Sequence, residues 1–285
     1  MQSLQNVIQI LDLEEIEKNH YRATSPDTGW QRVYGGQVIG QALVAASNTV
    51  DEDRQAHSLH GYFLRPGDTT IPILYKVDRI RDGRSFTTRR VVAIQNGQPI
   101  FAMSISFQVE EPGLEHQFPM PDAPPPEALV DEFELRAEQL KALPEEFQEP
   151  LSISSAIQIR WVDPLDFITP PAAPPHQMCW MRASESLPDN PRLHQCVLAY
   201  LSDWSLLDTS TRPHAISYVH QEVQMASLDH AMWFHRKFRS DDWLLYVQDS
   251  PSASGARGFN RGLIYNQAGD LVASTTQEGL MRVRS

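Results

Sequence analysis

Phe63-Leu64-Arg65 recurs as Phe234-His235-Arg236, 171 residues further along the chain. A second pair of matching segments, Gln95-Asn96-Gly97 and Gln267-Ala268-Gly269, follows at an offset of 172. In both copies the matching segments lead into a strand-like stretch. A single internal duplication is too short for a solenoid, which needs three or more units. The sequence therefore predicts two similar halves packed side by side.

Each half has the pattern of one helix followed by antiparallel strands. Small residues follow a helical spacing at Gly36–Ser47 and Leu193–Asp203, and a shorter helix is expected at Ile8–Ile16. Asp82-Gly83 and Asn96-Gly97 predict hairpin turns. The expected strands are Ser58–Leu64, Ile73–Ile80, Phe86–Gln95, Pro99–Val109, Ile153–Trp161, Ala215–Val219, Gln221–Trp233, Trp243–Asp249, Gly258–Asn266 and Leu271–Val283. This order predicts an α+β fold in which each sheet curls around a central helix and the two sheets pair edge to edge.

Proline content divides the chain. Pro119–Pro126 holds five prolines in eight residues, which neither a helix nor a central strand accommodates. A charged helix is expected after it, at Glu127–Leu143. We therefore expect an N-terminal domain at 1–112, a proline-rich linker with its helix at 113–150, and a C-terminal domain at 151–285.

Composition excludes several classes of protein. The chain has 285 residues, 41% of them hydrophobic, and a net charge of −12, which argues against a general binder of nucleic acid or anionic membranes. Cys179 and Cys196 form no CxxC motif or metal-ligand spacing, so we expect free thiols and neither a metal nor a cofactor. No signal peptide and no run of about 20 apolar residues is visible, so we expect no membrane span and a cytoplasmic location.

Four segments together resemble a known family. They are Gly35–Ala42 (GGQVIGQA), His57–Gly67 (HSLHGYFLRPG), Asp229–Arg236 (DHAMWFHR) and Ser274–Gly279 (STTQEG). The chain resembles the type II acyl-CoA thioesterases, bacterial and peroxisomal, from about Leu4 to Met281. The resemblance implies a double hot-dog fold, two hot-dog domains in one chain. It also implies a thioester hydrolase of fatty-acid and lipid metabolism that converts fatty acyl-CoA to free fatty acid and coenzyme A, and a homo-oligomer, either a dimer or a tetramer.

The resemblance also implies the catalytic residues. The family holds its attacking water with an Asp, a Thr or Ser, and a Gln, which match Asp203, Ser227 and Gln277 in this sequence. Bacterial members often carry Thr at the middle position. Ser227 keeps the hydroxyl but lacks the methyl group that restricts the rotamer.

The duplication supplies an independent comparison for these three positions. Their counterparts in the first half are Thr49 for Asp203, Ala56 for Ser227 and Ile105 for Gln277. A Gln in place of a buried Ile costs about 1–3 kcal/mol if it stays unpaired. A purely passive role is therefore disfavoured for Gln277, although a hydrogen-bonded structural Gln stays open, and a helix-end surface acid stays open for Asp203.

Other residues are candidates for binding the substrate. These are Gly36, at the start of a helix, His57, and the arginines Arg89 and Arg257 near matching hairpins, Arg89 being aligned with Arg261 at an offset of 172. A structural role is the alternative for each of them. The histidine pairs are spaced three and five apart, which in strands places their members on opposite faces and makes a poor metal site.

Two further functions stay open. The first is a hot-dog hydratase or dehydratase acting on enoyl-CoA, which uses an Asp with a His a few residues on; Asp203 has no His in the next five residues. The second is a non-catalytic acyl-CoA binding protein. The chain has no Gly-x-Ser-x-Gly segment that would indicate a serine nucleophile.

Overall fold

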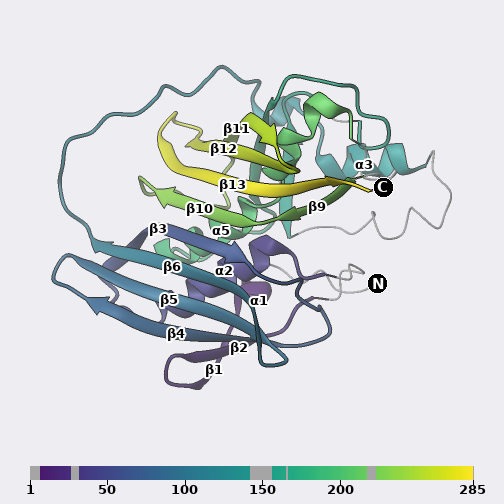
Figure 1. Ribbon diagram of the computed structural model, residues 1–285. Coiled ribbons are helices and arrows are strands. Elements are labelled where there is room, and N and C mark those ends of the chain that lie inside the picture. Colours follow the sequence, from purple (N-terminus) through teal and green to yellow (C-terminus); the bar gives the residue numbers. More distant parts are fainter. Residues whose placement is uncertain (1–6, 27–31, 142–155, 165, 217–222, 285) are drawn as a thin grey trace.

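The chain folds around one continuous antiparallel sheet of 13 strands (Figure 1). The computed structural model describes residues 7–26, 32–141, 156–164, 166–216 and 223–284. The strand order is β1-β2-β4-β5-β6-β3-β10-β13-β12-β11-β8-β7, with β9 also paired to β13. The N-terminal half, purple to teal in Figure 1, supplies the first six strands, and the C-terminal half, green to yellow, supplies the rest.

The strands and helices have the following bounds. The strands of the N-terminal half are β1 (Glu14–Glu17), β2 (His20–Ala23), β3 (Arg54–Phe63), β4 (Ile73–Asp82), β5 (Phe86–Gln95) and β6 (Gln98–Val109). Those of the C-terminal half are β7 (Ile157–Trp161), β8 (His176–Ala183), β9 (Val223–Ser227), β10 (Asp229–Phe234), β11 (Leu244–Ser254), β12 (Arg257–Asn266) and β13 (Leu271–Val283). The helices are α1 (Val7–Leu11), α2 (Gly35–Ser47), α3 (Glu132–Leu140) and α5 (Pro191–Leu201), with short 3-10 turns η1 (Pro126–Ala128), η3 (Leu207–Ser210) and η4 (Arg212–His214).

The two halves join through β3 and β10, which lie side by side in Figure 1. In this antiparallel pair Leu59 lies opposite Met232 and Gly61 lies opposite His230. An offset of 171 exchanges these two pairs with each other, so the register at the seam obeys the internal duplication. The predicted edge-to-edge pairing of the halves is confirmed, and it removes one exposed edge from each sheet.

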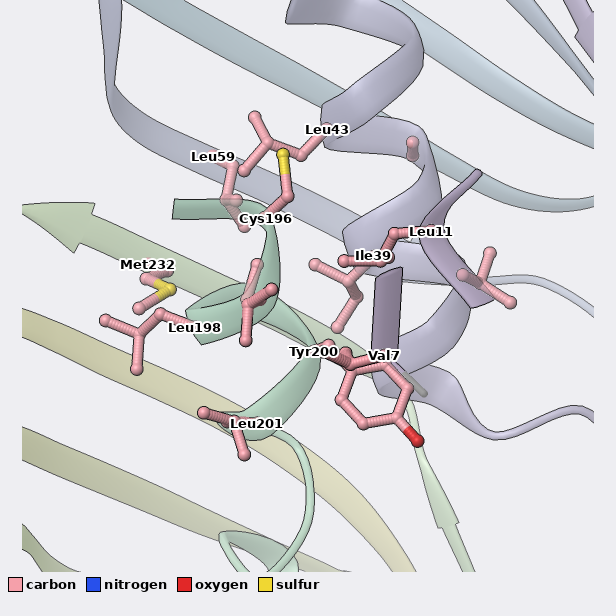
Figure 2. Close-up of a cluster of buried hydrophobic side chains, with 14 of the residues drawn as sticks. Val7, Leu11, Ile39, Leu43, Leu59, Cys196, Leu198, Tyr200, Leu201 and Met232 are labelled. Atoms are coloured by element: carbon pink, nitrogen blue, oxygen red, sulfur yellow. The ribbon is translucent and has the colours of Figure 1, made fainter. Parts of the chain in front are cut away.

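Helices α2 and α5 pack against each other on the inner side of the sheet. Figure 2 shows their shared core, in which Leu43 of α2 lies near Cys196 of α5 and Leu59 of β3, and Ile39 of α2 lies near Tyr200 of α5. The backbones approach closely at Gly40, where an added Cβ would lie 3.1 Å from the backbone oxygen of Cys196. The small residues seen in the sequence therefore allow one central helix from each half to pack directly against the other.

The duplication is more regular in the strands than the sequence alignment suggested. Arg89 pairs with Ile105 across β5 and β6, and Asn260 pairs with Gln277 across β12 and β13. Asn260, not Arg261, is thus the counterpart of Arg89, and the alignment of Arg89 with Arg261 is wrong by one residue. Burial agrees, because Arg89 and Asn260 are both buried whereas the Arg261 side chain is 55% exposed.

Several predicted elements differ from the structure. The helix expected at Ile8–Ile16 ends at Leu11, and the chain then forms β1, an edge strand whose four residues are all exposed. The strand expected at Ala215–Val219 is absent at Ala215, which has a left-handed φ of 53° after η4, and its last three residues lie outside the described chain. The strand expected at Gln221–Trp233 is interrupted at Leu228, and β8 was not predicted.

The proline-rich segment carries no helix or strand until η1. It packs against the C-terminal half, where Trp180 Nε1 donates to the backbone oxygen of Pro124 at 2.9 Å. The helix expected at Glu127–Leu143 forms only from Glu132, as α3, because its first residues belong to η1. The last two residues of that expected helix, and the start of the strand expected from Ile153, lie outside the described residues. The division into domains at residues 112 and 150 stays a prediction. No described helix is both long and apolar enough to cross a membrane.

Candidate active site

Asp203 lies just beyond the C-terminal end of α5, and its side chain is only 4% exposed. Its Oδ1 accepts hydrogen bonds from Gln277 Nε2 at 2.5 Å and from Ser227 Oγ at 3.4 Å. The three residues proposed from the sequence thus meet at one carboxylate oxygen. They come from three elements, the turn after α5, the end of β9 and the middle of β13, so only the folded sheet brings them together.

Gln277 is buried in β13, with 1% of its surface exposed. Its Nε2 lies between Asp203 Oδ1 and His230 Nδ1, at 2.5 and 3.3 Å. Its Oε1 is buried and has no hydrogen-bond partner among the described residues. Buried polar atoms are normally paired. This oxygen can therefore accept a hydrogen bond from a small molecule that enters the site.

Ser227 ends β9, one residue before the interruption at Leu228. The interruption is fixed on both sides, because the Leu228 N–H donates to the Glu278 oxygen and the Glu278 N–H donates to Asp229 Oδ1, at 2.9 and 2.6 Å. Ser227 still pairs with Gly279 of β13. The break in the strand therefore sets the position of the Ser227 hydroxyl relative to Asp203, while the backbone on both sides stays hydrogen bonded to β13.

The N-terminus of α2, from the other half, closes the site. An added Cβ on Gly35 would lie 2.5 Å from Asp203 Oδ2, and one on Gly36 would lie 2.3 Å from the Tyr200 backbone oxygen. The backbone N–H of Gly36 hydrogen bonds to the Asp203 carboxylate. The site thus combines a carboxylate of one half with the positive end of a helix of the other.

The surroundings tune the acidity of Asp203. Burial raises the pKa of this carboxyl from 3.8 to about 6, while the hydrogen bonds from Gln277, Ser227 and Gly36 act in the opposite direction. A carboxylate with a pKa near 6 is ionised at neutral pH and is a better proton acceptor than an exposed Asp. This acidity suits a general base.

Comparison with the N-terminal half shows that the buried carboxylate with its glutamine is confined to one copy. There, Arg89 donates to the hydroxyl and backbone oxygens of Thr49 at 2.8 and 3.1 Å and to Asp82 Oδ1 at 2.5 Å. Ile105 is buried and apolar at the position equivalent to Gln277. In the first copy, Arg89 therefore has partners for its donors within the protein. In the second copy, Gln277 Oε1 is an acceptor without a partner among the described residues.

Two residues of the site were missed in the sequence, His230 and Asn260. Both are buried, and the Oδ1 of Asn260, like the Oε1 of Gln277, has no hydrogen-bond partner in the described part of the chain. The offset of 171 would have revealed them, since it sets His230 opposite Leu59 and Asn260 opposite Arg89. In the second copy, a histidine thus replaces a leucine and an amide replaces an arginine.

The other candidates from the sequence lie in different settings. Gly36 is at the site. His57 hydrogen bonds through Nε2 to Ser106 Oγ at 2.8 Å and packs on Phe86, within the N-terminal half. Arg89 is buried and its donors are engaged by Thr49, Asp82 and backbone oxygens; its contact with substrate stays a prediction. Arg257 lies at the start of β12, half exposed, and donates to Glu278 Oε1 at 2.8 Å.

Known proteins match this chain over most of its length. The model of the acyl-CoA thioesterase family matches residues 171–280, and that of the acyl-CoA thioesterase N-terminal domain matches residues 24–108. Acyl-coenzyme A thioesterase 8 of Homo sapiens is 41% identical over 98% of this chain and 89% of its own length. The chain belongs to the acyl-CoA thioesterase family. Acyl-CoA thioesterase 2 of Haemophilus influenzae is 38% identical over 98% of each chain.

Solved structures show the fold of this thioesterase. A crystal structure of an acyl-CoA thioesterase II from Mycobacterium marinum is 45% identical, with a TM-score of 0.80 over 98% of this chain and 97% of the other. A hot-dog protein from Alicyclobacillus acidocaldarius, 18% identical over 97% and 98% of the two chains, has a TM-score of 0.76. The predicted family and the predicted double hot-dog α+β fold are confirmed.

Proposed function

We propose that this acyl-CoA thioesterase hydrolyses fatty acyl-CoA by direct attack of a water held by Asp203, Ser227 and Gln277, releasing free fatty acid and coenzyme A. The observation that supports the proposal most strongly is the shared acceptor, Asp203 Oδ1, to which both other side chains donate. A water that donates a hydrogen bond to the unpaired Oε1 of Gln277 would lie beside the amide that contacts the base.

The proposed reaction needs one base and no covalent intermediate. The Asp203 carboxylate accepts one proton of the water as the oxygen attacks the thioester carbon. The tetrahedral intermediate then expels the thiolate of coenzyme A as the carbon–sulfur bond breaks, and the proton passes from Asp203 to the thiolate. A thiol with a pKa of about 8.5 is a good leaving group, so acid assistance at this step can be weak.

The remaining groups orient the water and stabilise charge. Gln277 Oε1 accepts the second proton of the water as a hydrogen bond, and the Ser227 hydroxyl fixes the carboxylate. The N-terminus of α2 at Gly35 and Gly36 points at the site, where its partial positive charge favours the ionised base and the oxyanion that develops on the thioester carbonyl.

The geometry disfavours the hydratase alternative. That reaction needs a histidine that can exchange a proton with substrate, and the histidine nearest to Asp203 in the described site is His230. Its two ring nitrogens are already occupied by Ser202 Oγ and Gln277 Nε2, at 2.9 and 3.3 Å. A non-catalytic acyl-CoA binding protein would bind acyl-CoA without releasing thiol, so an assay of thiol release separates it from a hydrolase.

The decisive assay is thiol release on mixing the protein with acyl-CoA across a chain-length series. Steady release with multiple turnovers supports the proposal, and binding without release contradicts it. Intact-mass spectrometry of the protein quenched during turnover tests the route. An acyl group on Ser227 would show covalent catalysis and overturn the water mechanism, whereas unmodified protein with full turnover supports it.

Three associated points remain predictions. Arg257 is half exposed on the strand that neighbours Gln277, so it stays a proposed contact for coenzyme A phosphates, and His57 stays a weaker candidate. A homo-oligomer of double hot-dog chains is expected, and a monomeric mass in solution would contradict it. A cytoplasmic location is expected from the sequence.

A further inference from the structure

His230 lies in β10, in contact with the Gln277 amide, and is 1% exposed. Its Nε2 is 2.9 Å from Ser202 Oγ, its Nδ1 is 3.3 Å from Gln277 Nε2, and Nδ1 is 3.9 Å from Asp203 Oδ1. The Gln277 amide therefore lies between the carboxylate and the imidazole. The ring takes no direct part in the proposed reaction.

The hydrogen bonds select one tautomer of the ring. Ser202 Oγ donates its proton to the Ala199 backbone oxygen at 3.0 Å, so toward His230 it can only accept. Nε2 must then carry the proton, which leaves Nδ1 as an acceptor facing the Gln277 amide. Burial favours this neutral form, because it lowers the pKa of His230 to about 3.

The same contacts select one orientation of the Gln277 amide. Each of the two amide protons has an acceptor, Asp203 Oδ1 for one and His230 Nδ1 for the other. A flipped amide would set its oxygen against an ionised carboxylate oxygen and an imidazole lone pair, which is unfavourable on both sides. With both protons engaged, Oε1 must face away from these groups, and it is the atom without a partner.

We propose that His230 is a positioning residue for hydrolysis: its Nδ1 holds the Gln277 amide in the orientation that presents Oε1 to the attacking water. This inference rests on the proposed function, because it assigns a purpose to a contact of the proposed water-binding group. His230 itself does not touch the substrate or the water.

The N-terminal half supports a functional link between His230 and Gln277. There, Leu59 occupies the position of His230 and Ile105 that of Gln277, and the two lie opposite each other across β3 and β6. Both members of the pair are thus apolar in the copy that lacks the carboxylate, and both are polar in the copy that has it. A histidine needed only for packing would not have to change together with the glutamine.

Three substitutions at one position separate the positioning role from a structural one. His230→Asn keeps an acceptor close to the place of Nδ1, His230→Gln keeps only the distal contact toward Ser202, and His230→Leu copies the first half. We expect kcat to fall roughly 10- to 100-fold in the Gln and Leu variants, because a misplaced orienting group costs about that much. The Asn variant should stay within about threefold of wild type, and KM should change little in all three.

His194 provides the matched control. It is also buried, at 2% exposure, and its Nδ1 accepts from the Ser240 N–H at 3.0 Å, but it lies at the opposite end of α5, about 13 Å from Asp203 along the helix. His194→Leu should lower the melting temperature as His230→Leu does, with kcat unchanged. In a double-mutant cycle, His230→Leu should cost no further activity once Gln277 is replaced by Ile.

The outcomes separate this inference from the proposed function. If Asp203→Asn retains wild-type turnover, the proposed function fails. If Asp203→Asn is inactive while His230→Gln keeps wild-type kcat, only the role of His230 is overturned. Equal losses in the Asn and Gln variants also overturn it, and this comparison remains decisive if His230→Leu does not fold.

Discussion

Nε2 of Gln277 donates to Oδ1 of Asp203 across 2.5 Å, although the two residues are 74 positions apart in the chain. The amide comes from a central strand and the carboxylate from the turn after a helix, and both are buried. In the first half, Ile105 and Thr49 occupy these places. Only one of the two similar halves thus has the amide and carboxylate pair. A substitution in that half can therefore be compared with the reverse substitution at the equivalent position of the other half.

Exchanging the equivalent residues of the two halves tests this asymmetry. Gln277→Ile should lower kcat roughly 10- to 100-fold, because the water loses an orienting acceptor. It should also lower the free energy of unfolding by about 1–3 kcal/mol, because the buried Asp203 carboxylate and His230 lose the amide that donates to them. The reverse change, Ile105→Gln, should leave kcat unaltered and cost about 1–3 kcal/mol of stability, because the buried amide lacks partners. Thiol-release kinetics and urea denaturation measure the two effects. Similar kinetic losses in both variants would contradict the assignment of the site to one half.

Gly35 should tolerate no side chain. An alanine Cβ would lie 2.5 Å from Asp203 Oδ2 and 2.9 Å from Phe63 Cζ, so the carboxylate must move. Since small displacements of a catalytic group can cost about 100-fold, Gly35→Ala should lose most of its kcat while the protein remains folded. Gly97→Ala is the control: Gly97 has a φ of +71° and an added Cβ would contact nothing within 4 Å. It should cost about 1 kcal/mol of stability and no activity.

The pH dependence of kcat/KM should follow the ionisation of Asp203. Since burial raises its pKa to about 6 and the base acts only when ionised, kcat/KM should rise about tenfold per pH unit below 6 and level off above it. Ser227→Ala removes a hydrogen bond that stabilises the carboxylate, so its pKa rises further and the rise in activity should shift to higher pH. A profile from pH 4.5 to 8 measures both; an unshifted profile in the variant would show that Ser227 does not stabilise the base.

The same carboxylate should limit the stability of the protein. Its pKa is raised from 3.8 to about 6 on folding, so the folded state binds the proton more tightly than the unfolded state. The resulting penalty is absent below pH 3.8, grows between the two values and is complete above about pH 6. Asp203→Asn should therefore stabilise the protein at pH 8, by at most about 3 kcal/mol, and by less at pH 5. Urea denaturation at both pH values checks the difference; equal effects at both would contradict the raised pKa.

The fold was predictable wherever apolar and polar residues alternate. β5 and β13 have the predicted bounds because one face of each is buried and the other is not. β8 was missed because it is buried on both faces, one against the core and one, at Trp180, against the proline-rich segment, so its sequence does not alternate. β1 was missed for the opposite reason, since an exposed edge strand buries nothing.

The site was predictable only in part. Asp203, Ser227 and Gln277 could be proposed from the family resemblance and from their counterparts, none of which carries a carboxylate or an amide. Asn260 was missed because an offset of 172, which fits the hairpin turns, pairs Arg89 with Arg261; the strand register shows that the offset from β5 to β12 is 171. His230 was judged by its spacing from other histidines, and that spacing says nothing of the amide it contacts across the sheet.

The kinetics of Asp203→Asn test the central claim most directly. The substitution preserves the shape of the side chain and removes the base, so kcat should fall roughly 10²- to 10⁴-fold with KM changed by much less. Thiol release under saturating acyl-CoA, on protein shown to be folded by its melting curve, measures this ratio. A folded Asp203→Asn protein that turns over at close to the wild-type rate would contradict the assignment of Asp203 as the general base.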